Sequence, residues 1–172
     1  MLPNARGSDE KIPLFVTNQS VEEIATLSQT THQPGSDAIV EEAKAAGDTL
    51  YRQQKWQEAR DAYSQGVHLH ANDLNLRKLL LLNLAATNLQ LGDILKPLKI
   101  QSLYVGTGNW EDVLRNTATV LLADPKSAKA LYRAARALNE LKRSEEAYDC
   151  CTRLVLIYNH NISYQAIVFT DQ

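Results

Sequence analysis

The chain has 172 residues, 44% of them apolar and 22% charged, a composition typical of one globular domain. Its 18 basic and 20 acidic residues give a formal net charge of −2, which argues against the strongly basic face that nucleic-acid binding needs. No apolar run approaches the roughly 18 residues of a membrane span, and Asp9 and Glu10 stand where a signal peptide needs an apolar core. The two cysteines, Cys150 and Cys151, are adjacent and so build no disulfide framework. We therefore expect a reduced protein of the cytoplasm, with the nucleus as a second compartment.

The first 37 residues form an irregular N-terminal segment with three prolines and little periodicity. One apolar cluster, Ile12 to Val16, interrupts this segment. Further on, Ser20 with Glu23 three residues later has the pattern of a capping box and predicts a short helix over 21–27.

From Asp37 onward, apolar residues recur at helical spacing and predict an all-α fold. Gly92 is expected to end the third of these helices as its C′ residue, and the chain is then irregular up to Trp110. Asp124-Pro125 breaks the pattern again. A C-terminal tail over 162–172 has strand-like composition. The predicted helices cover about 37–53, 56–70, 74–91, 110–123, 125–140 and 144–158.

The predicted helices come in pairs, and small and bulky residues recur at matching places in the first and last pair. The two sets, each with spacings of 12 and 4 residues, are Gly47, Ala59 and Tyr63, and Ala135, Ala147 and Cys151. Small residues let the two helices of a pair approach closely, while the bulky residue fills the gap beside them. This spacing is similar to that of the tetratricopeptide repeat (TPR), whose period is about 34 residues.

The resemblance implies a helix-turn-helix superhelix of three repeats, the minimum for a stable stack. We place the repeats at about 40–73, 78–127 and 128–161, so that one TPR domain covers 38–161. The middle repeat fits only if an insert at about 94–109 is left out. This insert is either a partner-binding loop or an artefact of gene prediction, such as retained intron sequence.

Five positions on the first helices of the three repeats are candidates for binding. Lys44 and Asp48 lie one turn apart on the first, Asn83 lies on the second, and Lys129 and Arg133 lie one turn apart on the third. Because stacked first helices line the concave groove of such a superhelix, three cations and an amide donor would face one extended ligand. That set suits a peptide that ends in a carboxylate and carries further acids upstream.

The five positions resemble the two-carboxylate clamp of TPR co-chaperones, with the pattern Lys-x-x-x-Asn, then Asn, then Lys-x-x-x-Arg. In that family the clamp grips the C-terminal Glu-Glu-Val-Asp peptide of heat-shock proteins 90 and 70. Four positions match, and Asp48 replaces the first asparagine. An ionised Asp48 cannot donate a hydrogen bond to a peptide carboxylate and repels it, or pairs with Lys44 instead, so we predict weakened peptide binding.

Two further segments narrow the resemblance. Ile12-Pro13-Leu14-Phe15-Val16-Thr17 is similar to the short segment that precedes the repeats in the tetratricopeptide repeat protein 4 family, and the first turn, from Lys55 to Tyr63, also resembles that family. The likeness implies a co-chaperone adaptor for heat-shock protein 90, and also for heat-shock protein 70, with no cofactor and no catalytic residues. The apolar cluster would pack onto the first repeat, with a partner contact as the alternative.

Two other functions stay open at this point: a TPR scaffold for a different partner, and a module that targets an enzyme such as a phosphatase or a peptidyl-prolyl isomerase. The sequence contains no phosphate loop and no zinc spacing. His68 and His70 are two residues apart and so point to different sides of a helix, which makes them poor metal ligands.

Overall fold

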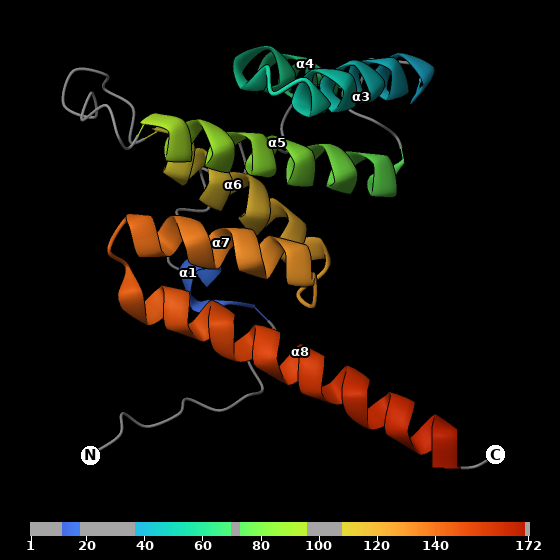
Figure 1. Cartoon of the computed structure of the whole chain (residues 1–172), viewed down its shortest axis with the longest axis vertical. Coiled ribbons are helices and arrows are strands. Elements are labelled where there is room, and N and C mark those ends of the chain that lie inside the picture. The colour runs from blue at the N-terminus through green and yellow to red at the C-terminus, as the bar shows by residue number, and fades with distance from the viewer. Residues whose placement is uncertain (1–11, 18–36, 70–72, 96–107, 171–172) are drawn as a thin grey trace.

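The fold is a stack of helix pairs. The computed structural model describes residues 12–17, 37–69, 73–95 and 108–170, and every element within these ranges is a helix, as the sequence predicted (Figure 1). The predicted helix over 21–27 and most of the insert lie outside the described residues. The helices are α1 (Leu14–Thr17), α3 (Asp37–Arg52), α4 (Trp56–His68), α5 (Leu74–Leu95), α6 (Gly108–Ala123), α7 (Ala128–Glu140) and α8 (Ser144–Thr170).

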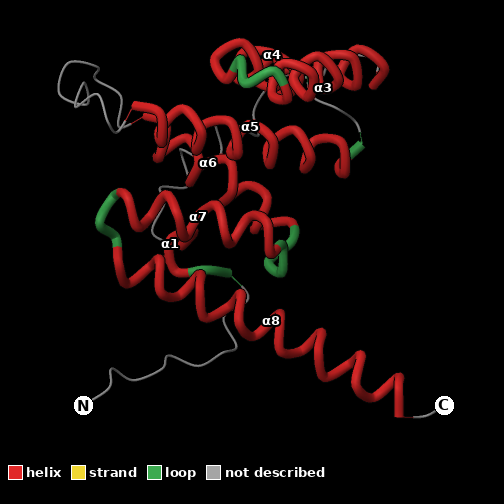
Figure 2. The backbone as a smooth tube through the Cα atoms, viewed as in Figure 1, coloured by secondary structure: helices red, strands yellow, loops and turns green. Residues whose placement is uncertain are grey.

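Consecutive helices pack against each other along the whole stack. Helix α3 packs on α4, α5 on α6 and α7 on α8, and the pairs are joined through contacts of α4 with α5 and of α6 with α7. Figure 2 shows the three pairs layered one below another, from α3 and α4 to α8. The first helices of the pairs also touch, α3 with α5 and α5 with α7. This arrangement is a TPR-like superhelix.

The turns within the first and third pairs have the same backbone structure. Gln54 and Lys142 both adopt a positive φ, 61° and 62°, which is uncommon for residues other than glycine. In each turn the next residue donates its N–H to a carbonyl five residues back, Lys55 to Leu50 at 3.0 Å and Arg143 to Leu138 at 2.9 Å. This is the hydrogen bond of a Schellman-type helix end. The two turns support the repeat register read from the sequence.

Two predicted helix ends are wrong. Gly92 does not end α5, which continues to Leu95, and no described glycine has a positive φ. Gly92 is instead a contact residue, because a Cβ at this position would lie 2.4 Å from the ring of Trp110 on α6. The last helix does not stop near Tyr158 but continues to Thr170, so 162–170 is helical despite its strand-like composition. No Gly or Pro occurs between Ser144 and Thr170 to break the helix.

Helix α1 packs onto the second and third repeats, and the expectation that it packs onto the first is wrong. Its contacts are with α6 and α8. Phe15 is fully buried and Val16 nearly so, both in the larger of two core clusters. The backbone N–H of Leu14 donates to the Asp149 carboxylate of α8 at 2.9 Å. Residues far apart in the chain therefore meet at this end of the stack.

The smaller core cluster joins the first pair to the second. Val40 of α3 and Ala59 and Tyr63 of α4 are buried there against Leu80 of α5. Because α5 belongs to both clusters, the first pair is fixed relative to the rest of the stack. The first helices α3, α5 and α7 consequently hold their polar faces in a defined relation to one another.

Candidate functional site

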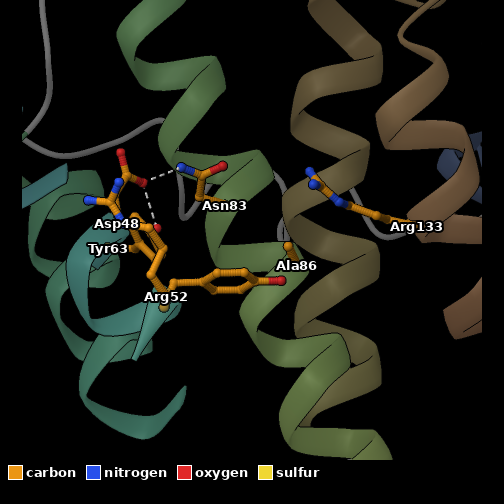
Figure 3. Close-up of a pocket in the computed structure, with 7 residues that line it drawn as sticks. Asp48, Arg52, Tyr63, Asn83, Ala86 and Arg133 are labelled. Carbon is orange, nitrogen blue, oxygen red and sulfur yellow. Dashed lines mark hydrogen bonds between the residues drawn. The ribbon is translucent and has the colours of Figure 1, made fainter. Parts of the chain in front are cut away.

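A pocket of about 310 Å³ opens across the first helices of the three pairs (Figure 3). It brings together three of the five predicted positions, Asp48 of α3, Asn83 of α5 and Arg133 of α7. In Figure 3 Asp48 lies on one side of the pocket, and Arg133 reaches toward it from the other. The remaining lining residues are Tyr51, Arg52, Tyr63 and Ala86.

The Asp48 carboxylate is the centre of a hydrogen-bond network. One of its oxygens accepts from the Tyr63 hydroxyl at 2.7 Å and from the Asn83 side-chain amide at 3.0 Å. The other oxygen accepts from the Lys44 ammonium at 2.7 Å. The predicted pairing of Asp48 with Lys44 is thus confirmed, and the network extends to two further helices.

Close packing of α3 on α4 fixes the position of the Tyr63 hydroxyl. A Cβ at residue 47 would lie 2.5 Å from the Tyr63 ring, so only glycine leaves room for the ring to cross α3 there. Tyr63 is 2% exposed. Its hydroxyl lies beside Asp48, the residue that follows Gly47 on α3. The small-and-bulky pattern of the repeat therefore also positions a hydrogen-bond donor in the pocket.

The pKa values of this network favour an ionised Asp48. Burial alone would raise the pKa of the Asp48 carboxyl, but the hydrogen bonds from Lys44 and Tyr63 and the positive charges of Lys44 and Arg52 outweigh it, so the pKa lies below its ordinary value. Burial and the adjacent Asp48 raise the pKa of the Tyr63 phenol, which stays protonated as a donor. Asp48 is therefore an anion at neutral pH that accepts hydrogen bonds from three residues.

The third repeat contributes cations. Arg133 is half-buried and donates from its guanidinium to the backbone carbonyl of Leu82 at 2.8 Å, which joins α7 to α5. Burial lowers its pKa, but a guanidinium stays charged in proteins. Lys129 lies one turn earlier on α7 and is exposed. It is not among the residues that line the pocket.

Sequence reasoning missed three residues of the pocket, Tyr51, Arg52 and Ala86, and one role. Tyr51 and Arg52 line it beside Asp48, although only Lys44 and Asp48 were predicted on α3. The signal for Arg52 was present, because residues 44, 48 and 52 follow one another at one-turn spacing. Tyr63 was predicted as a packing residue, and its hydroxyl bond to Asp48 needs the three-dimensional crossing of α3 and α4.

Other groups named from the sequence lie away from this pocket. Cys150 is buried, and burial and the neighbouring Asp149 raise the pKa of its thiol to about 12, while Cys151 is exposed on α8. Among the described residues, no three histidine, cysteine or acidic side chains come together as a candidate metal site. In the same ranges, no helix combines the length and hydropathy of a membrane span.

Three known proteins are similar to this chain, and no family profile matches it. Human zinc finger CCCH domain-containing protein 7B is 28% identical over 149 residues, which are 84% of this chain and 14% of that protein. The Hsp70/Hsp90 co-chaperone CNS1 of Saccharomyces cerevisiae is 25% identical over 130 residues, or 76% of this chain and 30% of that protein. The Hsp70/Hsp90 co-chaperone cns1 of Schizosaccharomyces pombe is 24% identical over 167 residues, which are 91% of this chain and 42% of that protein. The chain thus spans less than half the length of each of these relatives.

Proposed function

We propose that this chain is a co-chaperone adaptor that binds the acidic C-terminal peptide of heat-shock proteins 90 and 70. Two of its relatives are named Hsp70/Hsp90 co-chaperones. The observation that carries the proposal is the pocket across α3, α5 and α7, which joins Asn83 and Arg133 in one site. An adaptor for these chaperones would work in the cytoplasm, and the proposal assigns no catalytic step to it.

The binding chemistry is electrostatic. Arg133 and Arg52 line the pocket, and Lys129 is exposed one turn from Arg133, so acidic side chains of an extended peptide would meet several cations. Each charge-assisted hydrogen bond would contribute about 1.5–3 kcal/mol. The carboxylate of Asp48 acts against this attraction. We therefore expect modest affinity that falls as salt rises, because salt screens exposed charges.

A second candidate is an interaction scaffold for a different partner. The relative at 28% identity carries the name of a zinc finger protein and not of a co-chaperone. Asp48 also departs from the clamp pattern at one of its five positions. For this function the same pocket would bind another peptide, and heat-shock peptides would bind no better than unrelated acidic ones.

A calorimetric titration tests the proposal. A peptide ending in Glu-Glu-Val-Asp should bind the wild-type chain, and the double variant Lys129→Ala with Arg133→Ala should bind at least tenfold more weakly. Lys126→Ala is the matched control, because Lys126 is an exposed cation just before α7 that does not line the pocket. Circular dichroism should show that all variants keep their helices. Equal affinity of the double variant and the control would rule out this groove, and equal binding of a scrambled acidic peptide would favour the scaffold.

A further inference from the structure

Two of the donors that the clamp pattern would offer to a ligand are already bonded to a carboxylate of this chain. Lys44 and Asn83 are two of the clamp positions, and both donate to the Asp48 carboxylate, at 2.7 and 3.0 Å. The Tyr63 hydroxyl donates to the same group at 2.7 Å. A carboxylate of the protein thus lies beside Lys44 and Asn83, two donors that the clamp resemblance assigns to binding a peptide carboxylate.

Packing fixes the Tyr63 donor beside Asp48. Tyr63 cannot turn away, because its ring is buried against Gly47 and the backbone there leaves no space. Lys44 and Asp48 are one turn apart on α3 and form an ion pair at 2.7 Å, with side chains 26% and 34% exposed. A second carboxylate at this place would have to compete for these donors and would be repelled by Asp48.

The other side of the pocket differs. Arg133 of α7 lines it, and the lining residues include no aspartate or glutamate other than Asp48. Ala86 of α5 lies between the two sides in Figure 3, and Tyr51 also lines the pocket. Acidic side chains of a ligand can meet the Arg133 guanidinium at this end, whether or not the ligand's chain terminates there.

We propose that Asp48 is a built-in substitute for the ligand's terminal carboxylate, so that this groove binds an acidic peptide segment without requiring a free C-terminus. The inference rests on the proposed function, since it specifies the ligand of the same groove. It changes the ligand class from acidic C-terminal tails alone to acidic segments that include internal ones. In an Asp48→Asn variant, the carboxylate that accepts from Lys44 and Asn83 is gone. These two donors should then favour a ligand with a free C-terminal carboxylate.

The test compares three peptides by calorimetry on the full chain. The first ends in Glu-Glu-Val-Asp with a free carboxylate, the second is its C-terminal amide, and the third carries two extra glycines with a free carboxylate. The third peptide keeps the charge of the first but moves its terminus. Asp61→Asn is the matched control, because it removes an exposed carboxylate of α4 that does not line the pocket.

The wild type and Asp61→Asn should bind the first and third peptides within about twofold. Asp48→Asn should prefer the first by about tenfold, which corresponds to about 1.4 kcal/mol. If the wild type prefers the first peptide as strongly as Asp48→Asn does, the inference is wrong while the proposed function stands. If no variant binds any of the peptides, the proposed function fails and this ligand class fails with it. Binding by Asp48→Asn alone would show that Asp48 closes the groove, which also contradicts the inference.

Discussion

Asp48 is stabilised in its ionised form by residues of three helices. Lys44 lies on its own helix, Tyr63 on α4 and Asn83 on α5, and all three donate to its carboxylate. Such a charged group contributes to folding stability because its pKa differs between the folded and unfolded chain. Asp48 consequently links the pocket across α3, α5 and α7 to the stability of the first repeat.

The pH dependence of stability should reveal this link. The pKa of Asp48 is lowered in the fold, so its contribution is fully present above the unfolded value of about 3.9 and is lost as the pH falls through the folded value. We expect the free energy of unfolding of the wild type to exceed that of Asp48→Asn at pH 6, and the difference to shrink toward pH 3. Urea unfolding at a series of pH values measures it.

The Tyr63→Phe variant measures how much the hydrogen bond from Tyr63 contributes to the pH-dependent stabilisation by Asp48. The variant keeps the ring against Gly47 but removes one of the donors to Asp48, so the pH-dependent difference from the wild type should be smaller than for Asp48→Asn. A difference between the wild type and Asp48→Asn that stays constant from pH 6 to pH 3 would contradict the role given to the carboxylate.

At the level of the helices, glycine marks the closest crossings within pairs. Gly47 faces the ring of Tyr63 across α3 and α4, and Gly92 faces the ring of Trp110 across α5 and α6. The sequence predicted the first crossing from the repeat pattern but assigned Gly92 to a helix end. A glycine that ends a helix and one that admits an aromatic ring look alike in sequence, because only the packed partner tells them apart.

Gly92→Ala should therefore destabilise the fold. The added methyl would meet the Trp110 ring at 2.4 Å, and overpacking of a buried site costs about 1–3 kcal/mol. The better helix propensity of alanine offsets up to about 1 kcal/mol of this. We expect a net loss of about 1–2 kcal/mol in the free energy of unfolding, measured in urea with circular dichroism as the readout.

Gly66→Ala is the control for this experiment. Its methyl would meet the terminal methyl groups of Leu80 at 2.9 and 3.2 Å, which can shift more easily than an indole ring. Its loss of stability should be at least about 1 kcal/mol smaller than that of Gly92→Ala. Equal losses in the two variants would mean that the contact with Trp110 does not limit the approach of α5 and α6.

For the whole molecule, local sequence patterns predicted the stack of helix pairs but not the packing of α1 against α6 and α8. Periodicity and the spacing of small residues were sufficient to predict the order of the helices and to place Asp48, Asn83 and Arg133 on helices that line one pocket, because these features repeat with neighbouring units. The position of α1 does not repeat. Nothing in residues 12–17 indicates that they pack on α6 and α8. Helix α8 extends past its predicted end because no Gly or Pro breaks it, and this outweighs the weak strand preferences of its last residues.

Phe15→Ala measures how much α1 contributes to the whole stack. Phe15 is fully buried in the larger core cluster, and removing a buried aromatic ring costs about 3–5 kcal/mol. We expect a loss of that size in the free energy of unfolding. Thr17→Ala, at an exposed residue of the same helix, should change it by less than about 1 kcal/mol. A loss below 1 kcal/mol for Phe15→Ala would show that the stack does not depend on α1.

The hydrogen bond from Leu14 to Asp149 joins residues 135 positions apart. Helix pairs form through contacts between residues that are near one another in the chain, so each pair closes only a short loop. The contact between Leu14 and Asp149 closes a long loop, which costs more conformational entropy. We therefore expect the pairs to fold first and α1 to dock last. The slowest step of folding would then be the joining of the chain's beginning to its third repeat, and not the growth of the repeats themselves.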